Sequence, residues 1–220
     1  MVNEKTYLQN LILNRRIVRN YIESDETNPD LSDIPKLTIK IPTAGFSRGI
    51  EIVSVENKES IQKLAIYANE ETYIEKGFGK WISNSKAIFL ILINEAAYHE
   101  RYKMMDKKNE TSSKNWSVPY WYVDAGAAMM NCMLLIDETG LKSGFLGSHN
   151  MEVLEIKSLL NIPKNIEILG FVTAGVEGST KNIKKYTTEK PILTAQRCRI
   201  WFKHVRPNRS QSVPNIKINH

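Results

Sequence analysis

YWYVDAGAAMMNCMLLIDETG, residues 120–140, is the stretch that decides how this chain folds. Pro119 precedes it and Gly140 ends it, and these residue types commonly flank the start and the end of a helix. Within residues 125–136 only Asn131 is polar. A helix that is apolar on every side is buried on every side. The stretch therefore predicts one long helix, beginning near Pro119 and capped by Gly140, at the centre of the core or in a large subunit interface.

Hydrophobic periodicity around this helix predicts both helices and strands. Helices are expected over residues 4–14, 30–41, 58–71 and 150–162, and strands over 50–56, 86–93, 142–148, 165–176 and 197–205. Because several helices precede the first strand, this order favours a layered α+β domain over a doubly wound one. The charged segment 99–115 lacks a pattern, and we expect it to be a mobile surface excursion.

Length and composition are those of an ordinary soluble protein. The chain has 220 residues, and we predict a single domain over residues 1–205 followed by a loosely ordered basic tail over 206–220. We expect neither a signal peptide nor a membrane span. Cys132 and Cys198 are far apart and in no metal-binding spacing, so we expect a cytoplasmic protein without a metal.

The net charge of +6 is unevenly distributed along the chain. Residues 178–220 carry ten bases and one acid, whereas residues 1–177 carry twenty bases and twenty-three acids. Such a basic end contacts nucleic acid in some proteins and is a solvated arm in others. No nucleic-acid-binding module is visible elsewhere, so we expect no nucleic-acid partner.

Three arginines occupy five positions in LILNRRIVRNYI, residues 11–22. Guanidinium groups this close repel one another unless water or an anion screens them. If a helix ends near residue 14, Arg15, Arg16 and Arg19 lie at its end and complement its dipole. Alternatively, their planar forks bind a phosphate or a flavin-type oxygen. The residues alone leave both interpretations open.

Two glycine-containing loops and an aromatic cluster are further candidates for a site. IPTAGFSRG, residues 41–49, can offer backbone N–H groups to a flat ligand. GFLGSHN, residues 144–150, joins a strand end to a helix start, where ligands often bind. The cluster of Trp116 and residues 120–122 either packs in a core or interface, or walls a pocket for a planar substrate.

The order of these motifs resembles that of the FMN-dependent nitroreductase-like family. NRRIVRNY, IPTAGFSRGIEIVSV, YWYVDAGAAMMNCMLLIDETGLKSGFLG and LLNIPKNIEILGFVTAGV follow one another over roughly residues 8–176. The resemblance implies an α+β three-layer sandwich with a central, mostly antiparallel sheet flanked by helices. It also implies an intertwined homodimer, joined through the long central helix, with FMN bound at the dimer interface.

The resemblance implies roles for the three arginines. Arg15 and Arg16 match the basic pair that holds the flavin phosphate and ribityl chain. Arg19 matches the basic residue near the pyrimidine edge of the ring, where it would stabilise negative charge on the reduced flavin. Ile17 stands where the family usually has a serine. That departure leaves the choice between FMN and a deazaflavin open.

The resemblance also implies contacts from two loops and a late basic residue. The further implied cofactor-binding residues are Pro42, Thr43, Ala44, Leu146, Gly147 and Lys190. The first three match the loop along the ring, and the next two match the stretch whose N–H approaches the hydride-accepting nitrogen. Phe46 replaces a common asparagine, and the late basic pair has no clean match. Lys184 and Lys185 therefore stay as alternatives to Lys190.

The implied activity is that of an FMN-dependent oxidoreductase that takes electrons from NAD(P)H. It would reduce a small electron-poor substrate, of the nitroaromatic, quinone or enone type, by ping-pong hydride transfer. The flavin carries the chemistry, so no catalytic side chain is expected. The alternative is a flavin-binding protein of the same fold that holds or senses flavin without turnover. The sequence does not choose between NADH and NADPH.

Overall fold

The computed structural model describes residues 5–24, 29–107 and 111–179. These residues belong to one unit of the chain, Met1–Lys181. The predicted late strand 197–205, the tail 206–220, Lys190 and the predicted domain boundary lie outside the described residues. Among the described helices, none combines the length and the hydrophobicity that crossing a bilayer requires.

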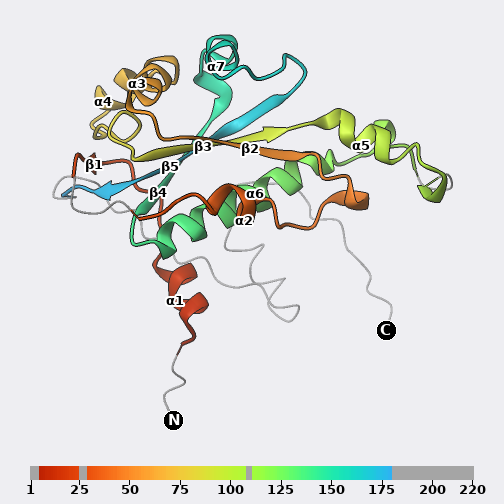
Figure 1. The fold of residues 1–220 in the computed structure, drawn as a ribbon, viewed down its shortest axis with the longest axis horizontal. Helices are drawn as coiled ribbons and strands as arrows, with labels where there is room; N and C mark the ends of the chain where they lie inside the picture. The colour runs from red at the N-terminus through yellow and green to blue at the C-terminus, as the bar shows by residue number, and fades with distance from the viewer. Residues whose placement is uncertain (1–4, 25–28, 108–110, 180–220) are drawn as a thin grey trace, which may run out of the picture. The chain divides into compact units, whose positions relative to one another are not determined.

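The described strands form one five-stranded sheet in which every pairing is antiparallel (Figure 1). The strands are β1 (Tyr21–Ile22), β2 (Ile50–Val55), β3 (Ala87–Ile93), β4 (Lys142–Gly147) and β5 (Glu167–Glu177). Their order is β1-β5-β3-β2, and β4 also pairs with β5. This confirms the predicted α+β class with a mostly antiparallel sheet, and the four strands predicted within the described residues.

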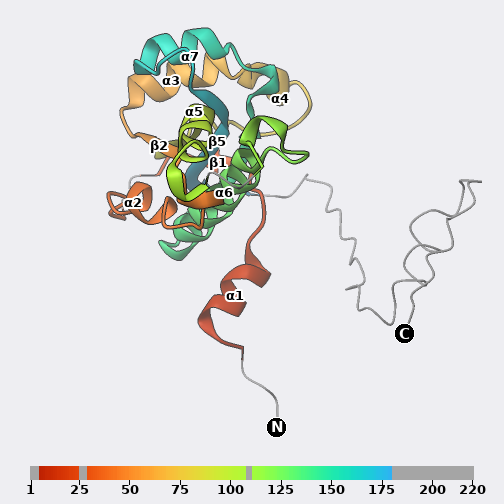
Figure 2. The same cartoon turned by 90° about the vertical axis from the view of Figure 1, so that its right-hand side faces the viewer.

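Helices cover both faces of the sheet, which gives three layers (Figures 1 and 2). The helices are α1 (Tyr7–Asn14), α2 (Ile34–Thr38), α3 (Lys58–Tyr67), α4 (Glu70–Ile74), α5 (Glu95–Arg101), α6 (Tyr120–Glu138) and α7 (Val153–Leu160). The helices α3, α4 and α7 lie on one face, and α2 and α6 on the other. The layered sandwich that the resemblance implied is therefore present.

The alternation of β3 explains why both layers are needed. All seven residues of this strand are buried. Ile88, Leu90 and Leu92 belong to the core cluster with α3 and α7. Phe89 and Ile91 belong to the second cluster, with α6. Because successive side chains of a strand point to opposite faces, a strand that is apolar throughout requires cover on both sides.

The long helix α6 begins and ends as predicted, but one chain buries only one of its sides. Trp121, Asp124, Ala125, Ala128, Cys132, Met133, Ile136 and Asp137 are buried. Val123 and Ala127 are exposed, and Gly126, Met130 and Leu134 are half-buried. These positions recur at helical spacing and form one stripe. Of the two predicted surroundings, the core accounts for one face, and the apolar stripe stays uncovered within one chain.

Three predicted elements differ from the structure in their bounds. The helix expected over 30–41 is limited to α2, with Pro35 in its first turn. The helix expected over 58–71 is two helices, α3 and α4, because Asn69 between them adopts a left-handed conformation with φ of 55°. The excursion expected over 99–115 begins inside α5, so its first residues are helical.

A buried carboxylate, Glu70, fixes the turn between α4 and β3. Its side chain accepts backbone hydrogen bonds from Trp81 at 2.9 Å, Ile82 at 2.6 Å and Ser83 at 3.1 Å. Its residue is only 6% exposed. Charge-assisted hydrogen bonds to backbone N–H groups are stronger than neutral ones. Glu70 therefore satisfies three backbone donors that the turn would otherwise bury without acceptors.

Replacing Glu70 by Gln should destabilise the fold, because a neutral amide oxygen is a weaker acceptor than the carboxylate Oε1, and the N–H₂ group would face the N–H of Ser83, which now lies 3.2 Å from Oε2. We expect the free energy of unfolding to fall by about 2 kcal/mol, as for a lost hydrogen bond to a charged group. Urea unfolding followed by circular dichroism measures it. The control is E71Q, which changes an exposed residue of the same helix. A loss in E70Q no larger than in E71Q would contradict this role.

Candidate functional site

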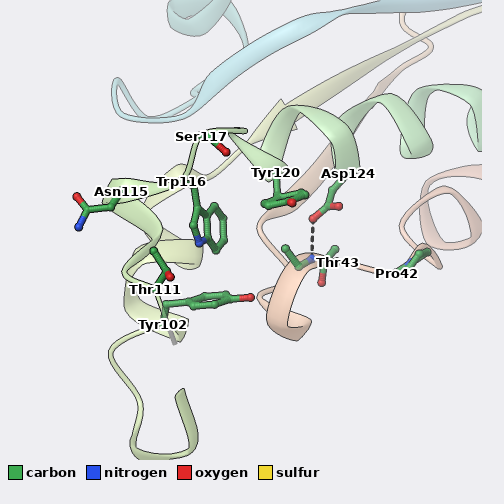
Figure 3. Close-up of a pocket in the computed structure, with 10 residues that line it drawn as sticks. Pro42, Thr43, Tyr102, Thr111, Asn115, Trp116, Ser117, Tyr120 and Asp124 are labelled. Carbon is green, nitrogen blue, oxygen red and sulfur yellow. Dashed lines mark hydrogen bonds between the residues drawn. The ribbon is translucent and has the colours of Figure 1, made fainter. Parts of the chain in front are cut away.

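A cavity of about 710 Å³ lies where the start of α6 meets the loop before β2 and the segment after α5 (Figure 3). The residues that line it are Pro42, Thr43, Ala44, Tyr102, Thr111, Asn115, Trp116, Ser117, Tyr120 and Asp124. The predicted loop residues 42–44 therefore share one cavity with two members of the predicted aromatic cluster. For Trp116 and Tyr120 this supports the pocket-wall interpretation, whereas Trp121 is buried in the core.

Three aromatic rings form the wall of this cavity. The ring centroids of Tyr102 and Trp116 lie 4.7 Å apart and those of Trp116 and Tyr120 5.2 Å apart. Both pairs meet edge to face, the arrangement that aromatic quadrupoles favour. Trp116 also stacks on Trp121, with an interplanar angle of 29°. Packing thus holds the indole of Trp116 between two tyrosines.

Asp124 joins the loop of the cavity to two helices. Its Oδ2 atom accepts a hydrogen bond from the backbone N–H of Ala44 at 2.9 Å and one from the hydroxyl of Tyr98 at 2.8 Å. Burial, together with the hydrogen bond to Asp124 and its charge, raises the pKa of Tyr98. The phenol therefore stays protonated and keeps donating. This contact sets the position of residues 42–44 against α6.

The helix α5 holds both walls of the cavity through Arg101. Its Nε donates to the carbonyl of Gly45 at 2.7 Å, and its terminal nitrogens donate to the two carboxylate oxygens of Asp106. One guanidinium thus connects the glycine loop to the segment that carries the aromatic wall.

A second contact of α5 fixes the far part of that segment. The Nδ1 of His99 lies 2.7 Å from the hydroxyl of Ser113, and its Nε2 lies 3.0 Å from a carboxylate oxygen of Glu95. Most described residues after Tyr102 in the predicted surface excursion over 99–115 are exposed, as expected, but side-chain hydrogen bonds tie Asp106 and Ser113 to α5. The sequence feature that could have predicted α5 is Asn94, whose side chain caps this helix by accepting a hydrogen bond from the N–H of Ala97.

The glycine loop has an unusual backbone. Gly45, Phe46 and Arg48 have φ values of 61°, 61° and 54°. Gly45 is required there, because a Cβ at this position would collide with the ring of Tyr102. Phe46 is 66% exposed, and the guanidinium of Arg48 lies 4.2 Å from its ring centroid. Left-handed conformations in two non-glycine residues indicate a loop held by its surroundings.

The arginine cluster lies elsewhere, directly after α1. Arg15 is the C-cap residue, and its N–H donates to the carbonyl of Leu11 at 2.9 Å, as the helix-end interpretation predicted. Its Nε, however, is buried and has no hydrogen-bond partner among residues 5–24, 29–107 and 111–179. Arg16 is exposed and forms an ion pair with Glu177 of β5.

Arg19, like Arg15, has a buried Nε donor without a hydrogen-bond partner in the described part of the chain. Its guanidinium carbon lies 5.6 Å from the ring centroid of Phe78 and 5.7 Å from that of Trp81. Because buried donors in native proteins nearly always have acceptors, two such guanidinium groups fit a ligand rich in oxygen atoms. Helix-dipole complementarity alone does not explain them.

The strand β4 connects the arginine segment to the other predicted residues. The N–H of Val18 donates to the carbonyl of Ser143 at 2.9 Å, near the start of β4. Leu146 and Gly147 end the same strand, and Gly147 pairs with Gly170 of β5. A side chain on Gly170 would collide with the backbone of Leu146. The arginine segment therefore meets β4 near its start, and Leu146 and Gly147 lie at the other end of the same strand.

The two groups of predicted residues lie at opposite ends of α6. Asp124 lines the cavity. Asp137 accepts hydrogen bonds from the backbone N–H and the hydroxyl of Ser143, whose carbonyl in turn accepts from Val18 of the arginine segment, so this segment lies near Asp137. Thirteen residues of α-helix separate the two carboxylates, a distance of about 20 Å at 1.5 Å per residue. One chain therefore does not bring residues 42–44 and the arginines together.

Comparisons with known proteins agree with the motif order. The sequence matches the nitroreductase family over residues 12–176. A protein of Archaeoglobus fulgidus, whose name proposes NADH dehydrogenase or NAD(P)H nitroreductase activity, is 24% identical over 174 residues, 78% of this chain and 86% of that protein. The NADPH-flavin oxidoreductase of Vibrio harveyi is 21% identical over 173 residues, 79% of this chain and 67% of that enzyme.

Among solved structures, the FMN-dependent nitroreductase of Clostridium difficile has a TM-score of 0.57 and 20% identity, and covers 80% of this chain and 90% of its own. Nitroreductase A of Vibrio parahaemolyticus has a TM-score of 0.60 and 16% identity, with 93% and 85% covered. At these identities the structural likeness shows a shared fold.

Proposed function

This chain belongs to the nitroreductase family, whose members are flavin-dependent NAD(P)H oxidoreductases, and we propose that it is an FMN enzyme that reduces a small electron-poor substrate. The substrate would be of the nitroaromatic, quinone or enone type. The observation that carries this proposal is the pair of buried Nε atoms on Arg15 and Arg19, neither of which has a hydrogen-bond partner among the residues that the structure describes. The names of the Vibrio harveyi and Clostridium difficile relatives support the choice of flavin.

The residues present fit an FMN molecule. Arg15 offers a donor to a phosphate, and Arg19, stacked on Phe78 and Trp81, offers one to a carbonyl at the edge of a ring. Arg16 would join them only by sharing its guanidinium with Glu177. The last residues of β4, Leu146 and Gly147, would offer backbone N–H groups farther along the same molecule.

FMN held by these residues would supply the hydride chemistry between NAD(P)H and the second substrate. The residues of the chain itself would bind the cofactor and the substrates, orient them and shield them from water. The positive charge of Arg19 would favour negative charge on a ring edge bound beside it, since opposite charges attract strongly in a partly buried site. The aromatic wall around Trp116 stacks on planar molecules. Because one cavity would receive NAD(P)H and the substrate in turn, the order of events is ping-pong.

The complete site would need two chains. Residues 42–44 and Arg15 lie at opposite ends of α6, so one chain presents two half-sites. The apolar stripe of α6, with Val123 and Ala127, is uncovered in one chain. The helix α1 buries none of its residues, although Leu8 and Ile12 are apolar. We place the homodimer interface on these two helices, so that the cavity of one chain faces the arginines of its partner.

The absorption spectrum of the purified protein tests the proposed function. We expect a flavin band that bleaches when NADPH or NADH is added without oxygen, and the faster reductant identifies the donor. A band that neither nucleotide bleaches would favour a flavin-holding protein over an oxidoreductase. Protein that carries no flavin and takes up none from added FMN would contradict the proposal altogether.

Replacing Arg15 by Ala should weaken FMN binding more than tenfold, because a charge-assisted hydrogen bond to phosphate is worth about 1.5–3 kcal/mol. Quenching of flavin fluorescence during titration of the apoprotein measures the dissociation constant. The control is Lys63→Ala, which removes an exposed positive charge from α3 on the other face of the sheet. If both variants bind FMN like the unchanged chain, Arg15 is only a helix cap.

Introducing a charge into the stripe of α6 should dissociate the dimer. Val123 is 54% exposed in one chain, so Val123→Glu leaves the protomer core intact but would bury a carboxylate in the interface. We expect a monomer by light scattering and a loss of bound flavin. The matched control is Ile66→Glu, at a residue of α3 that is 71% exposed. A V123E protein that stays dimeric at micromolar concentration would place the interface elsewhere.

A further inference from the structure

We propose that the aromatic cavity selects planar aromatic cations, of the N-alkylated pyridinium or quinolinium type, over neutral and anionic rings of the same shape. This inference names the ligand class of the site and rests on the proposed function for its catalytic meaning. It depends on three features of the cavity. These are the faces of its aromatic rings, its one charged side chain among the described residues, and the other contacts that the neighbouring basic side chains make.

The ring faces are those of Tyr102, Trp116 and Tyr120 (Figure 3). Aromatic faces carry the negative part of the ring quadrupole and attract cations, with indole the strongest. Tyr102 already shows this preference, because the ammonium of Lys107 lies 5.4 Å from its ring centroid. Trp116 is only half-buried and Tyr120 is 43% exposed, so both rings are accessible from the cavity.

The charged side chain is Asp124, and no other Asp, Glu, Lys or Arg of the described residues lines the cavity. Its Oδ2 atom is occupied by the N–H of Ala44 and the hydroxyl of Tyr98. Neither of these neutral donors cancels the charge of the carboxylate. At 8% exposure this charge is poorly screened by water. A cation bound among the rings would therefore be attracted by the charge of a nearby, partly desolvated carboxylate.

Within one chain, the nearby bases do not neutralise this carboxylate, and Arg48 of the glycine loop lies over the ring of Phe46. Arg101 donates hydrogen bonds to Gly45 and Asp106, and Lys103 forms an ion pair with Glu100. Lys107 lies over the ring of Tyr102, and the exposed Lys114 does not line the cavity. His99 is held between Ser113 and Glu95. The cavity thus combines the rings of Trp116 and Tyr120, and that of Tyr102 with Lys107 beside it, with one negative charge, which is the composition of a cation-binding aromatic box.

Such a ligand also suits reduction. A positive charge in the ring withdraws electrons from the atom that accepts hydride, so a cationic ring is more electron-poor than its neutral analogue. The carboxylate of Asp124 would hold that charge while the rings orient the plane of the ligand. The same box would disfavour benzoate-type anions, because their charge opposes that of Asp124.

The test compares three probes that share one ring system and differ in charge. They are N-methylquinolinium, quinoline at pH 8, where it is uncharged, and quinoline-4-carboxylate. Isothermal titration calorimetry on the protein as purified measures each dissociation constant. We expect N-methylquinolinium to bind at least tenfold more tightly than quinoline, and the carboxylate to bind most weakly. Equal binding of the three probes, preference for the anion, or no binding at all would overturn the inference.

Two variants locate the preference. Asp124→Asn keeps an acceptor for Ala44 and Tyr98 but removes the charge, so the preference for the cation should fall below threefold. The matched control is Glu138→Gln, which removes an exposed charge at the other end of the same helix and should leave the preference unchanged. A preference that survives D124N, or that is lost equally in E138Q, would also overturn the inference.

Two substitutions of Trp116 test the same inference if the D124N protein does not fold. Trp116→Leu should lower the affinity for the cation more than that for quinoline, whereas Trp116→Phe should retain most of the preference. Equal losses for both probes would contradict the inference. Flavin content and bleaching by NAD(P)H are recorded on the same samples. Protein that is reduced normally but ignores probe charge refutes this inference alone, whereas protein without flavin refutes the proposed function.

Discussion

The buried carboxylate of Asp124 is the interaction on which the cavity depends. It lies on α6, accepts from Ala44 of the glycine loop and from Tyr98 of α5, and so joins three elements at one oxygen atom. The strained loop after Pro42 stays in place because this contact and the one from Arg101 to Gly45 hold both of its sides. Without them, a loop with left-handed non-glycine residues would relax.

A second buried carboxylate, that of Glu70, organises the opposite end of the sheet. Glu70 accepts from the backbone of Trp81, Ile82 and Ser83 and so fixes the turn that presents the indole of Trp81 to Arg19. Buried carboxylates that accept backbone N–H bonds are effective organisers, because each removes several unsatisfied donors at once. Both ends of the molecule thus rely on a buried acid, with partners 11 to 13 residues away for Glu70 and 26 and 80 residues away for Asp124.

The two half-sites have opposite electrostatic character. The half-site along β4 has buried guanidinium donors on Arg15 and Arg19, which suit an anionic cofactor. The half-site at the start of α6 has aromatic faces and the carboxylate of Asp124. In a dimer of the proposed kind, each complete site would combine one of each. A cofactor phosphate and a cationic ligand would then be held at separate positions, and neither would compete for the other's place.

The sequence by itself determined what depends on local pattern: the bounds of α6, the doubly buried β3, and the motif order that identifies the family. It also located residues 42–44, Trp116 and Tyr120 as site candidates. It missed α5, whose contacts hold residues 99–115. Only the tertiary structure decided which face of α6 stays uncovered and which acids organise the ends. The physical reason is distance along the chain: Ala44 and Asp124 are 80 residues apart, and no periodicity encodes such a contact.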